Sequence, residues 1–483
     1  MKQAQTTEAP KLCRREFMCA CGCTAAGAAL ASKGLVGTVV AAEAANRTTG
    51  PATVRCAFLY PPTASLKKAG YYSWPGSGFD AEGHQKAYLP RIAAIAQKLG
   101  MQIPMDEKPL HDSAGVARFI GQVKQSKPDG LLLIPFYKGT WASVVRIVKE
   151  TGIPTVTLAT MGILLNPHIN QLYRTPGVYL ISSLDDFDAV EYGMKMIRTS
   201  RQMKESRIVS LAGSGGQETA VAHLGTRVRA LPRKRFAEEF KRVQTTDEVR
   251  ALARAYQHNA KKVVEPSEAD VLDAAKTYVA CKRILAAEKG DAIMMDCLGG
   301  IRERTFPPPC MGFMSLRDEG VPAGCQNDLD ATLTMMLVQN LFDKPGFQQN
   351  ASSDTEKNHY YGAHCTSPTK LNGPAGPAEA YVLRTHAEAG IGTVPEVIWP
   401  VGQEVTMAHY LARKKPQMIV YSGKVVGRCE MPPAGGCRTN VALTINEVSD
   451  VCDVKGMHQT IFFGNHARQL RRYCQLSGIP VIT

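Results

Sequence analysis

After residue 50 the sequence has no uncharged apolar run long enough to cross a bilayer, which excludes an integral membrane protein for this part of the chain. Internal repeats and low-complexity tracts are also absent. Hydrophobic residues make up 44% of the chain and charged residues 21%, which excludes a disordered or collagen-like protein. We therefore expect a globular chain of 483 residues with two or three domains of roughly 100–200 residues each.

Several catalytic signatures are missing as well. The sequence contains neither a His-Glu-x-x-His motif nor a nucleophile elbow. Gly213, Gly215 and Gly216 follow an expected strand, but they lack the spacing of a dinucleotide fingerprint and the Lys-Ser/Thr pair of a P-loop. They form either a turn whose amides hold an anion or, as we expect, an ordinary strand-to-helix turn.

The charge balance is strongly basic, with a formal net charge of +14. Such a charge can attract polyanions such as nucleic acid or anionic lipid. The densest basic run has five Arg or Lys between residues 227 and 235, with a Pro inside it and only Phe236 beside it. Nucleic-acid patches interleave aromatic residues, so we expect a solvated basic loop and no nucleic-acid partner. A polyanion-binding surface is an alternative that rests on net charge alone.

The N-terminus resembles a bacterial twin-arginine export signal. Arg14 and Arg15 precede Phe17, and an Ala/Gly/Val-rich stretch follows over residues 25–42. That stretch is too weakly hydrophobic for a membrane anchor, and residues 42–44 fit a small-x-small cleavage site. The resemblance implies removal of residues 1–44, the twin-arginine machinery as a partner, and a periplasmic or other extracytoplasmic location. A disordered arm with a chance Arg pair is the alternative.

Four of the 14 cysteines fall inside the expected signal, and ten remain. An even number of cysteines in an exported protein ordinarily indicates disulfides. Twin-arginine cargo, however, folds in the reducing cytoplasm before export. We therefore expect free buried thiols and assign no pairing.

From residue 53 onward, apolar strands alternate with amphipathic helices, which predicts parallel sheets covered on both faces. The expected strands are 53–60, 130–135, 155–158, 178–182, 207–211 and 291–297, and the expected helices are 85–99, 114–125, 141–151, 185–199, 248–256, 268–287 and 329–341. After Pro345, short β-type runs replace the helical periodicity. The predicted fold class is α/β, with two Rossmann-like parallel-sheet domains (51–170 and 171–345) followed by a β-rich C-terminal domain (346–483).

The most informative motifs lie within residues 291–371 and 436–482. An Asp-Glu-Gly-x-Pro-Ala-x-Cys-x-x-Asp block ends at Asp328 and precedes an apolar helix. A His-Cys-Thr turn begins at His364, and a late block beginning at His458 precedes a final Ile-Pro-Val run. These motifs resemble the L-fucose/L-arabinose isomerase superfamily, in particular its shorter, fucose-isomerase-like members. The resemblance covers most of residues 50–483 and implies two α/β domains before a β-rich domain.

The resemblance also implies a divalent metal, usually manganese, held by two carboxylates and a late histidine. Asp328 matches the carboxylate of the Cys-x-x-Asp block, and His458 matches the late histidine. The second carboxylate of the family lies a few dozen residues before the first. Glu303 is the nearest candidate here, and Asp296 and Glu319 are alternatives.

The activity that the resemblance implies is aldose–ketose isomerisation through an enediol. A hard divalent ion, manganese or magnesium, holds the carbonyl and hydroxyl oxygens together while a carboxylate moves the proton. Asp328 and Glu303 are then metal ligands and the acid/base pair, and His458 is a ligand. Gln326, where many relatives carry Glu, and His364 are expected to contact the sugar. The family often assembles as trimers or hexamers, so a homo-oligomer is expected.

Each of these residues also has a structural alternative. Asp328 can cap the helix that follows it, since Asp is a favoured N-cap. His458 can be a buried structural histidine, and Glu303 can pair with the Arg residues beside it. For the whole protein, the alternative is a non-catalytic exported carbohydrate-binding protein on the same scaffold. Gln326 and the lack of a clean match for the second carboxylate favour binding, whereas Asp328 and His458 favour catalysis.

Overall fold

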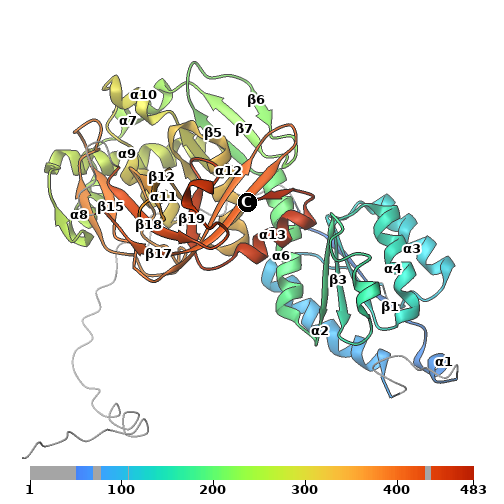
Figure 1. The fold of residues 1–483 in the computed structure, drawn as a ribbon. Helices are drawn as coiled ribbons and strands as arrows, with labels where there is room; N and C mark the ends of the chain where they lie inside the picture. The colour runs from blue at the N-terminus through green and yellow to red at the C-terminus, as the bar shows by residue number, and fades with distance from the viewer. Residues whose placement is uncertain (1–49, 69–77, 107, 430–436) are drawn as a thin grey trace, which may run out of the picture. The chain divides into compact units, whose positions relative to one another are not determined.

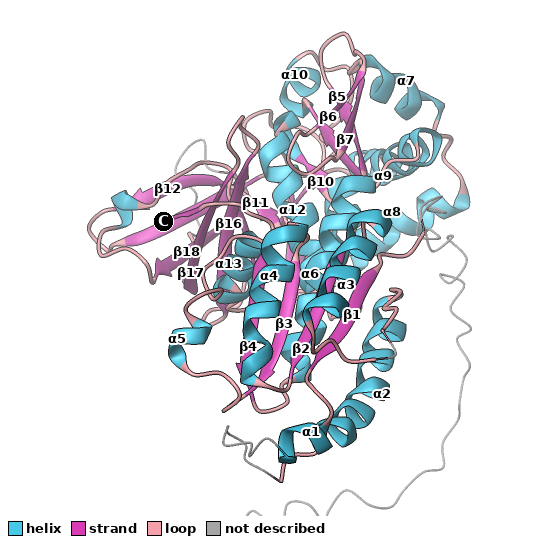
Figure 2. Cartoon of the chain, turned by 90° about the vertical axis from the view of Figure 1, so that its right-hand side faces the viewer, coloured by secondary structure: helices cyan, strands magenta, loops and turns pink. Residues whose placement is uncertain are grey.

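The computed structural model describes residues 50–68, 78–106, 108–429 and 437–483. The export signal expected over residues 1–44 lies outside the described residues. Contacts along the chain gather Thr48–Thr483 into one compact unit. Within this unit the fold is mixed α/β, with parallel-strand sheets and one large antiparallel sheet (Figures 1 and 2).

The first sheet has four parallel strands in the order β1-β2-β3-β4. Its strands are β1 (Val54–Leu59), β2 (Gly130–Pro135), β3 (Thr155–Thr160) and β4 (Val178–Ser183), and the helices of this region are α1 (Thr63–Lys68), α2 (Ala81–Leu99), α3 (Ser113–Ser126), η1 (Lys138–Thr140), α4 (Trp141–Thr151), α5 (Asn166–Ile169) and α6 (Phe187–Glu205). Helices α3 and α4 cover one face, and α2 and α6 cover the other (Figure 1). Because both faces are covered, β2 is buried along its whole length.

Strand β4 corrects one expectation from the sequence. The run at 178–182 is a strand, but it does not begin a second α/β unit. It pairs in parallel with β3, from Thr155 opposite Val178 to Thr160 opposite Ser183. Consecutive strands usually lie side by side, and only the short helix α5 lies between these two. The first sheet therefore extends to Ser183.

The second sheet has the order β10-β9-β5-β7-β6 and is parallel except for β6, which runs antiparallel to β7. Its strands are β5 (Arg207–Leu211), β6 (Glu218–Ala220), β7 (Arg227–Leu231), β9 (Ala292–Met295) and β10 (Ala323–Gly324), and the helices of this region are α7 (Lys234–Arg242), α8 (Asp247–Asn259), α9 (Glu268–Glu288), α10 (Cys297–Arg302), α11 (Cys310–Asp318), η2 (Cys325–Asn327) and α12 (Leu329–Phe342). The strands expected at 207–211 and 291–297 are confirmed to within two residues.

The basic run between residues 227 and 235 is not the solvated loop that its composition predicts. Its first part forms β7, and its last two residues begin α7. Carboxylates neutralise several of its cations: Arg229 pairs with Glu288 and Arg235 with Glu239. With their charges paired, these side chains are accommodated in regular structure.

The chain after Pro345 is β-rich, as expected. Most of its strands form one antiparallel sheet in the order β11-β19-β16-β17-β18-β13-β12, and β20 joins β17 in parallel. Its strands are β11 (Phe347–Gln348), β12 (Asn350–Asp354), β13 (His359–His364), β16 (Glu404–Leu411), β17 (Gln417–Gly427), β18 (Thr439–Ile445), β19 (Thr460–Phe463) and β20 (Val481–Ile482). A small sheet holds β8 (Lys262–Val263), β14 (Tyr381–Arg384) and β15 (Val394–Val397), and η3 (Val451–Asp453) and α13 (Ala467–Leu476) complete the chain.

Helices α12 and α13 tie these sheets together. Helix α12 contacts α6, β9 and β16, and every residue from Ala331 to Val338 is buried. Helix α13 contacts β4 and β17, and the Tyr192 hydroxyl of α6 donates a 2.7 Å hydrogen bond to the carbonyl oxygen of Gln469. The start of α12 is consequently held from several sides, and Asp328 lies there.

His466 lies at the N-terminus of α13, and its ring stacks on Phe342 at a centroid distance of 4.6 Å. Burial lowers the pKa of His466, and the nearby cations Lys344 and Lys195 lower it further. The imidazole is therefore neutral in the fold, whereas the unfolded chain takes up a proton near the ordinary pKa of about 6.5. Its contribution to stability is complete above that pH and is lost as the pH falls below it.

We predict that the free energy of unfolding of the wild type falls between about pH 7 and pH 5 more steeply than that of His466→Gln. Urea titrations at a series of pH values measure both slopes. His111→Gln is the control, because the His111 side chain is 40% exposed. Equal slopes for the wild type and His466→Gln contradict the prediction.

Candidate functional site

Asp328 lies at the end of a strained turn that joins β10 to α12. Gln326 and Asn327 both have positive φ, at 55° and 54°, which non-glycine residues adopt only at a cost. The Ser210 hydroxyl donates a 2.8 Å hydrogen bond to the Asn327 side-chain oxygen and holds this turn against the end of β5. Strain of this kind persists where the surroundings enforce it, often at functional sites.

The Asp328 carboxylate uses its two oxygens differently. Oδ1 accepts a 2.8 Å hydrogen bond from the backbone amide of Ala331, which makes Asp328 the N-cap of α12. Oδ2 accepts a 2.7 Å hydrogen bond from Nδ1 of His458, 130 residues further along the chain. The structural alternative and the functional expectation for Asp328 are therefore compatible, because capping occupies only one of the oxygens.

His458 completes this pair from the loop before β19. It has a φ of 58° and is 8% exposed. Its Nε2 lies 2.7 Å from the side-chain oxygen of Asn350, at the start of β12. The imidazole is thus held between a carboxylate and an amide, which fixes the plane of its ring.

The environment favours the charged form of Asp328. Burial acts to raise its pKa, but the hydrogen bonds from His458 and from the Ala331 amide outweigh burial and hold the pKa of the carboxyl below its ordinary value. Asp328 is consequently a carboxylate at neutral pH, as a ligand for a cation must be.

The structure does not bring a second carboxylate to this pair. Glu303 ends α10, and both of its oxygens lie 2.6 Å from Nη2 of Arg233. The two alternatives are also bound elsewhere: Asp296 pairs with Arg233, and Glu319 with Lys282. Over the described ranges, Asp328, His458 and Glu303 do not form a group of ligand atoms close enough to share one ion.

The two expected sugar-binding residues lie next to the pair. Gln326 belongs to the strained turn two residues before Asp328. His364 ends β13, is 1% exposed, and its ring centroid lies 5.9 Å from that of His458. His364 is therefore a neighbour of His458, on a side facing the protein interior.

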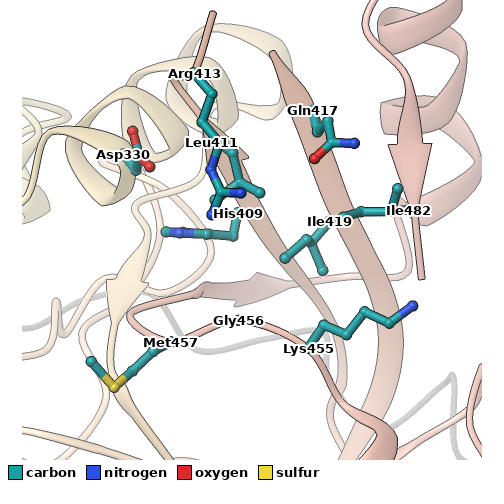
Figure 3. A pocket seen from close by; sticks show the side chains of 10 residues that line it. All are labelled: Asp330, His409, Leu411, Arg413, Gln417, Ile419, Lys455, Gly456, Met457 and Ile482. Carbon is teal, nitrogen blue, oxygen red and sulfur yellow. The ribbon is translucent and has the colours of Figure 1, made fainter. Parts of the chain in front are cut away.

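A cavity of about 350 Å³ with both polar and apolar walls is lined by residues that neighbour the pair in the sequence (Figure 3). Asp330 of α12 and Met457 line it, and these residues flank Asp328 and His458 in the sequence. Its other lining residues are His409, Leu411, Arg413, Gln417, Ile419, Lys455, Gly456 and Ile482. In Figure 3, His409, Leu411 and Arg413 follow one strand, β16 and its end, while Gln417 and Ile419 come from β17. The walls therefore carry one carboxylate, two cations, an amide and an imidazole.

Two groups of this cavity have shifted pKa values. Burial raises the pKa of Asp330, against the hydrogen bond that it accepts from the Ala412 amide. Burial lowers the pKa of His409, against the attraction of Asp328 and Asp330. A carboxylate with a raised pKa is a stronger proton acceptor than an ordinary aspartate.

Sequence reasoning did not identify Asp330, His409 or Asn350. Asp330 stands two residues after Asp328, and this Asp-x-Asp spacing was the one available signal. His409 was not identified because the strand that carries it, β16, was not expected. Asn350 was not identified because β12 was not expected either. Both strands are recognisable only once their partners in the sheet are known.

The Asp328 carboxylate and the His458 imidazole are the two side chains of this site that can bind an ion. Oxygen donors with one imidazole suit a hard divalent cation such as Mn²⁺, whose remaining positions can be filled by water or substrate. An ion held by Asp328 and His458 would replace the proton on Nδ1, and Nε2 on the opposite edge of the ring can donate to Asn350, which orients the imidazole. The pair therefore suits a divalent ion but does not reproduce the set of two carboxylates that the resemblance implies.

No helix within the described ranges combines the length and apolar character needed to cross a membrane. The chain matches no model of a protein family, and no curated protein matches it. The geometry of Asp328 and His458, with the cavity lined by their neighbours in the sequence, is therefore the ground on which a function is proposed.

Proposed function

We propose that this chain is an exported, metal-dependent sugar isomerase of the fucose-isomerase type, which interconverts an aldose and a ketose through an enediol. The observation that carries the proposal is the 2.7 Å contact between Asp328 and His458. The family resemblance implies that these two residues, which stand 130 positions apart in the sequence, are metal ligands.

The order of the sheets along the chain supports the finer fold assignment that accompanies this proposal. A parallel sheet comes first, a mainly parallel sheet second and a large antiparallel sheet last. We propose that these correspond to two Rossmann-like domains and a β-rich C-terminal domain, with α12 carrying the site at the junction of the last two.

In the proposed site, Asp328 and His458 hold the cation, and Asn350 orients the imidazole of His458. When bound, Mn²⁺ polarises the sugar carbonyl and stabilises the negative charge of the enediolate. Asp330 takes the proton from the carbon beside the carbonyl and returns it to the neighbouring carbon, for which its raised pKa is suited. Arg413, Lys455 and Gln417 line the cavity and bind sugar hydroxyls.

The second candidate function is non-catalytic carbohydrate binding on the same scaffold. The observation that favours it is the ion pair between Glu303 and Arg233. This ion pair occupies Glu303, the nearest candidate for the second carboxylate ligand. The two functions differ in one chemical property, because only an isomerase exchanges the carbon-bound proton of the sugar.

We predict that the full chain with Mn²⁺ catalyses the uptake of deuterium from D₂O into the carbon-bound position of one member of an aldose panel, as detected by NMR. Asp330→Asn keeps the oxygen that accepts from Ala412 and removes the acid/base function. It should lower the rate by about 10²–10⁴-fold. Asp343→Asn, at the exposed far end of α12, is the matched control and should leave the rate unchanged.

Saturable sugar binding without deuterium exchange in the wild type would favour the non-catalytic protein. If neither exchange nor sugar binding is detected across the panel, both proposed functions are wrong.

A further inference from the structure

A cluster of sulfur and imidazole side chains lies in the interior, apart from the oxygen ligands of the proposed site. Cys310 begins α11, Cys325 begins the turn η2, and Cys365 directly follows β13. His364 and His386 lie on either side of them. All five side chains are buried, with at most 6% exposed.

The five residues form two overlapping triads that share Cys365. The ligand atoms of Cys310, Cys365 and His386 all lie within 4.8 Å of one another, and so do those of Cys325, His364 and Cys365. In the second triad, His364 Nδ1 lies 3.3 Å from the Cys365 sulfur. Sulfur atoms bound to one tetrahedral ion are separated by similar distances, since each Zn–S bond is about 2.3 Å long.

One imidazole nitrogen of the cluster, Nδ1 of His386, has no hydrogen-bond partner, in a side chain that is 3% exposed. Buried polar atoms in native proteins nearly always have a partner, so this exception calls for an explanation such as a bound ion.

The backbone around the thiols is fixed by buried hydrogen bonds. Gln348 accepts from the Cys325 amide at 2.9 Å and donates to its carbonyl oxygen at 3.2 Å. The Thr366 hydroxyl donates to the Cys310 carbonyl oxygen at 2.8 Å, and Arg317 donates to the Thr366 carbonyl oxygen at 3.2 Å. The three sulfurs are therefore held in place by their surroundings, as outer-shell contacts hold the ligands of metal sites.

We propose that Cys310, Cys365 and His386 bind one soft d¹⁰ cation, Zn²⁺ or Cu⁺, and leave its fourth position to water or a neighbouring side chain. Two thiolates and one imidazole are a ligand set known for zinc, and thiolates also select Cu⁺. Each cysteine releases its proton to solvent as it binds, and no electron is transferred. The proposed site at Asp328 favours a hard ion, so the two proposed sites differ in their chemistry.

The test uses the full chain, reduced and stripped of metal, in two titrations. Co²⁺ replaces Zn²⁺ and reports thiolate ligation through its sulfur-to-cobalt charge-transfer and tetrahedral d–d bands. Cu⁺ is titrated in competition with a chromophoric chelator. The variants are Cys365→Ala and Cys310→Ala, and Cys474→Ala in α13 is the control, because Cys474 is buried but belongs to neither triad.

We expect both cluster variants to lose one tetrahedral equivalent of Co²⁺ relative to the wild type and to the Cys474→Ala control. The four cysteines before residue 45 are present in every variant and cancel in this difference. The Cu⁺ titration identifies which soft ion binds more tightly. Circular dichroism checks that each variant is folded, and His364→Gln combined with His386→Gln tests the same site without removing a sulfur.

Equal Co²⁺ and Cu⁺ uptake by the wild type, by folded Cys365→Ala and by the double histidine variant overturns the proposal. A disulfide between Cys365 and Cys310 or Cys325, found by mass spectrometry in protein purified without reductant and persisting with Zn²⁺ present, also overturns it. Asp328→Asn distinguishes the two sites, because that substitution should leave the soft-ion titration unchanged.

Discussion

Asp328→Asn should abolish high-affinity Mn²⁺ binding while leaving the protein folded. Asn is as good an N-cap as Asp, so the hydrogen bond from the Ala331 amide can be kept. What disappears is the negative charge facing His458. Loss of an outer-shell partner alone weakens metal binding by about 10–100-fold, so loss of a ligand charge should reduce the Mn²⁺ affinity at least about 100-fold. Isothermal titration calorimetry with MnCl₂ measures this change.

Asp186→Asn is the matched control for that experiment. Asp186 caps α6 and accepts a 2.9 Å hydrogen bond from the Ala189 amide, so the two substitutions make the same chemical change at the same position of a helix. His458→Gln provides a second route to the same loss. Unchanged Mn²⁺ affinity in both Asp328→Asn and His458→Gln would show that the pair is structural.

The second large effect is expected at Arg317, which is 2% exposed in α11. Its Nε donates a 2.9 Å hydrogen bond to the Ala323 carbonyl oxygen, and its Nη1 donates to that of Thr366 at 3.2 Å. Nη2 lies 3.5 Å from the Cys325 sulfur. Arg317 therefore joins the segment before Asp328 to the segment after His364.

Arg317→Met keeps much of the aliphatic volume but leaves two buried carbonyl oxygens without donors. Each unsatisfied group costs about 1–3 kcal/mol, so we expect the free energy of unfolding in urea to fall by about 2–5 kcal/mol. Arg283→Met is the control, because Arg283 is 49% exposed in its ion pair with Glu239, and it should change stability by less than about 0.5 kcal/mol. A similarly small change for Arg317→Met would mean that these hydrogen bonds contribute little.

Local patterns in the sequence predicted most of the individual elements. The continuous apolar run at 130–135 is β2, and the amphipathic periodicity at 141–151 is α4. Both signals reside in neighbouring residues, so no knowledge of tertiary contacts was needed. Helix α2 begins four residues earlier than expected because Asp80 caps it, accepting from the Gly83 amide.

Pairing between distant strands was harder to predict. Strand β4 was expected in a second unit but pairs with β3 in the first sheet. Strands β12 and β16 were not expected, because the alternation of polar and apolar residues in them is weak and their partner strands cannot be identified from neighbouring residues. The same reason explains the missed site residues His409 and Asn350, which these strands carry. Asp328 and His458 were singled out because they match motifs of the family that the sequence resembles, whereas their contact depends on tertiary structure.

Glu303 shows that position in a motif does not by itself identify a metal ligand. Its position before Asp328 made it the nearest candidate for the second carboxylate, but its partner Arg233 comes from a segment 70 residues away. An ion pair of this kind cannot be read from spacing. The metal role of Glu303 stays a prediction.

The central claim is that Asp328 and His458 form a binding site for a hard divalent cation. Its most direct test is the manganese content of the purified chain from residue 45 to residue 483, measured by elemental analysis after dialysis against MnCl₂ and removal of free metal. We predict about one Mn²⁺ per chain in the wild type and none in Asp328→Asn. Wild-type protein that is folded but retains no manganese would contradict the claim.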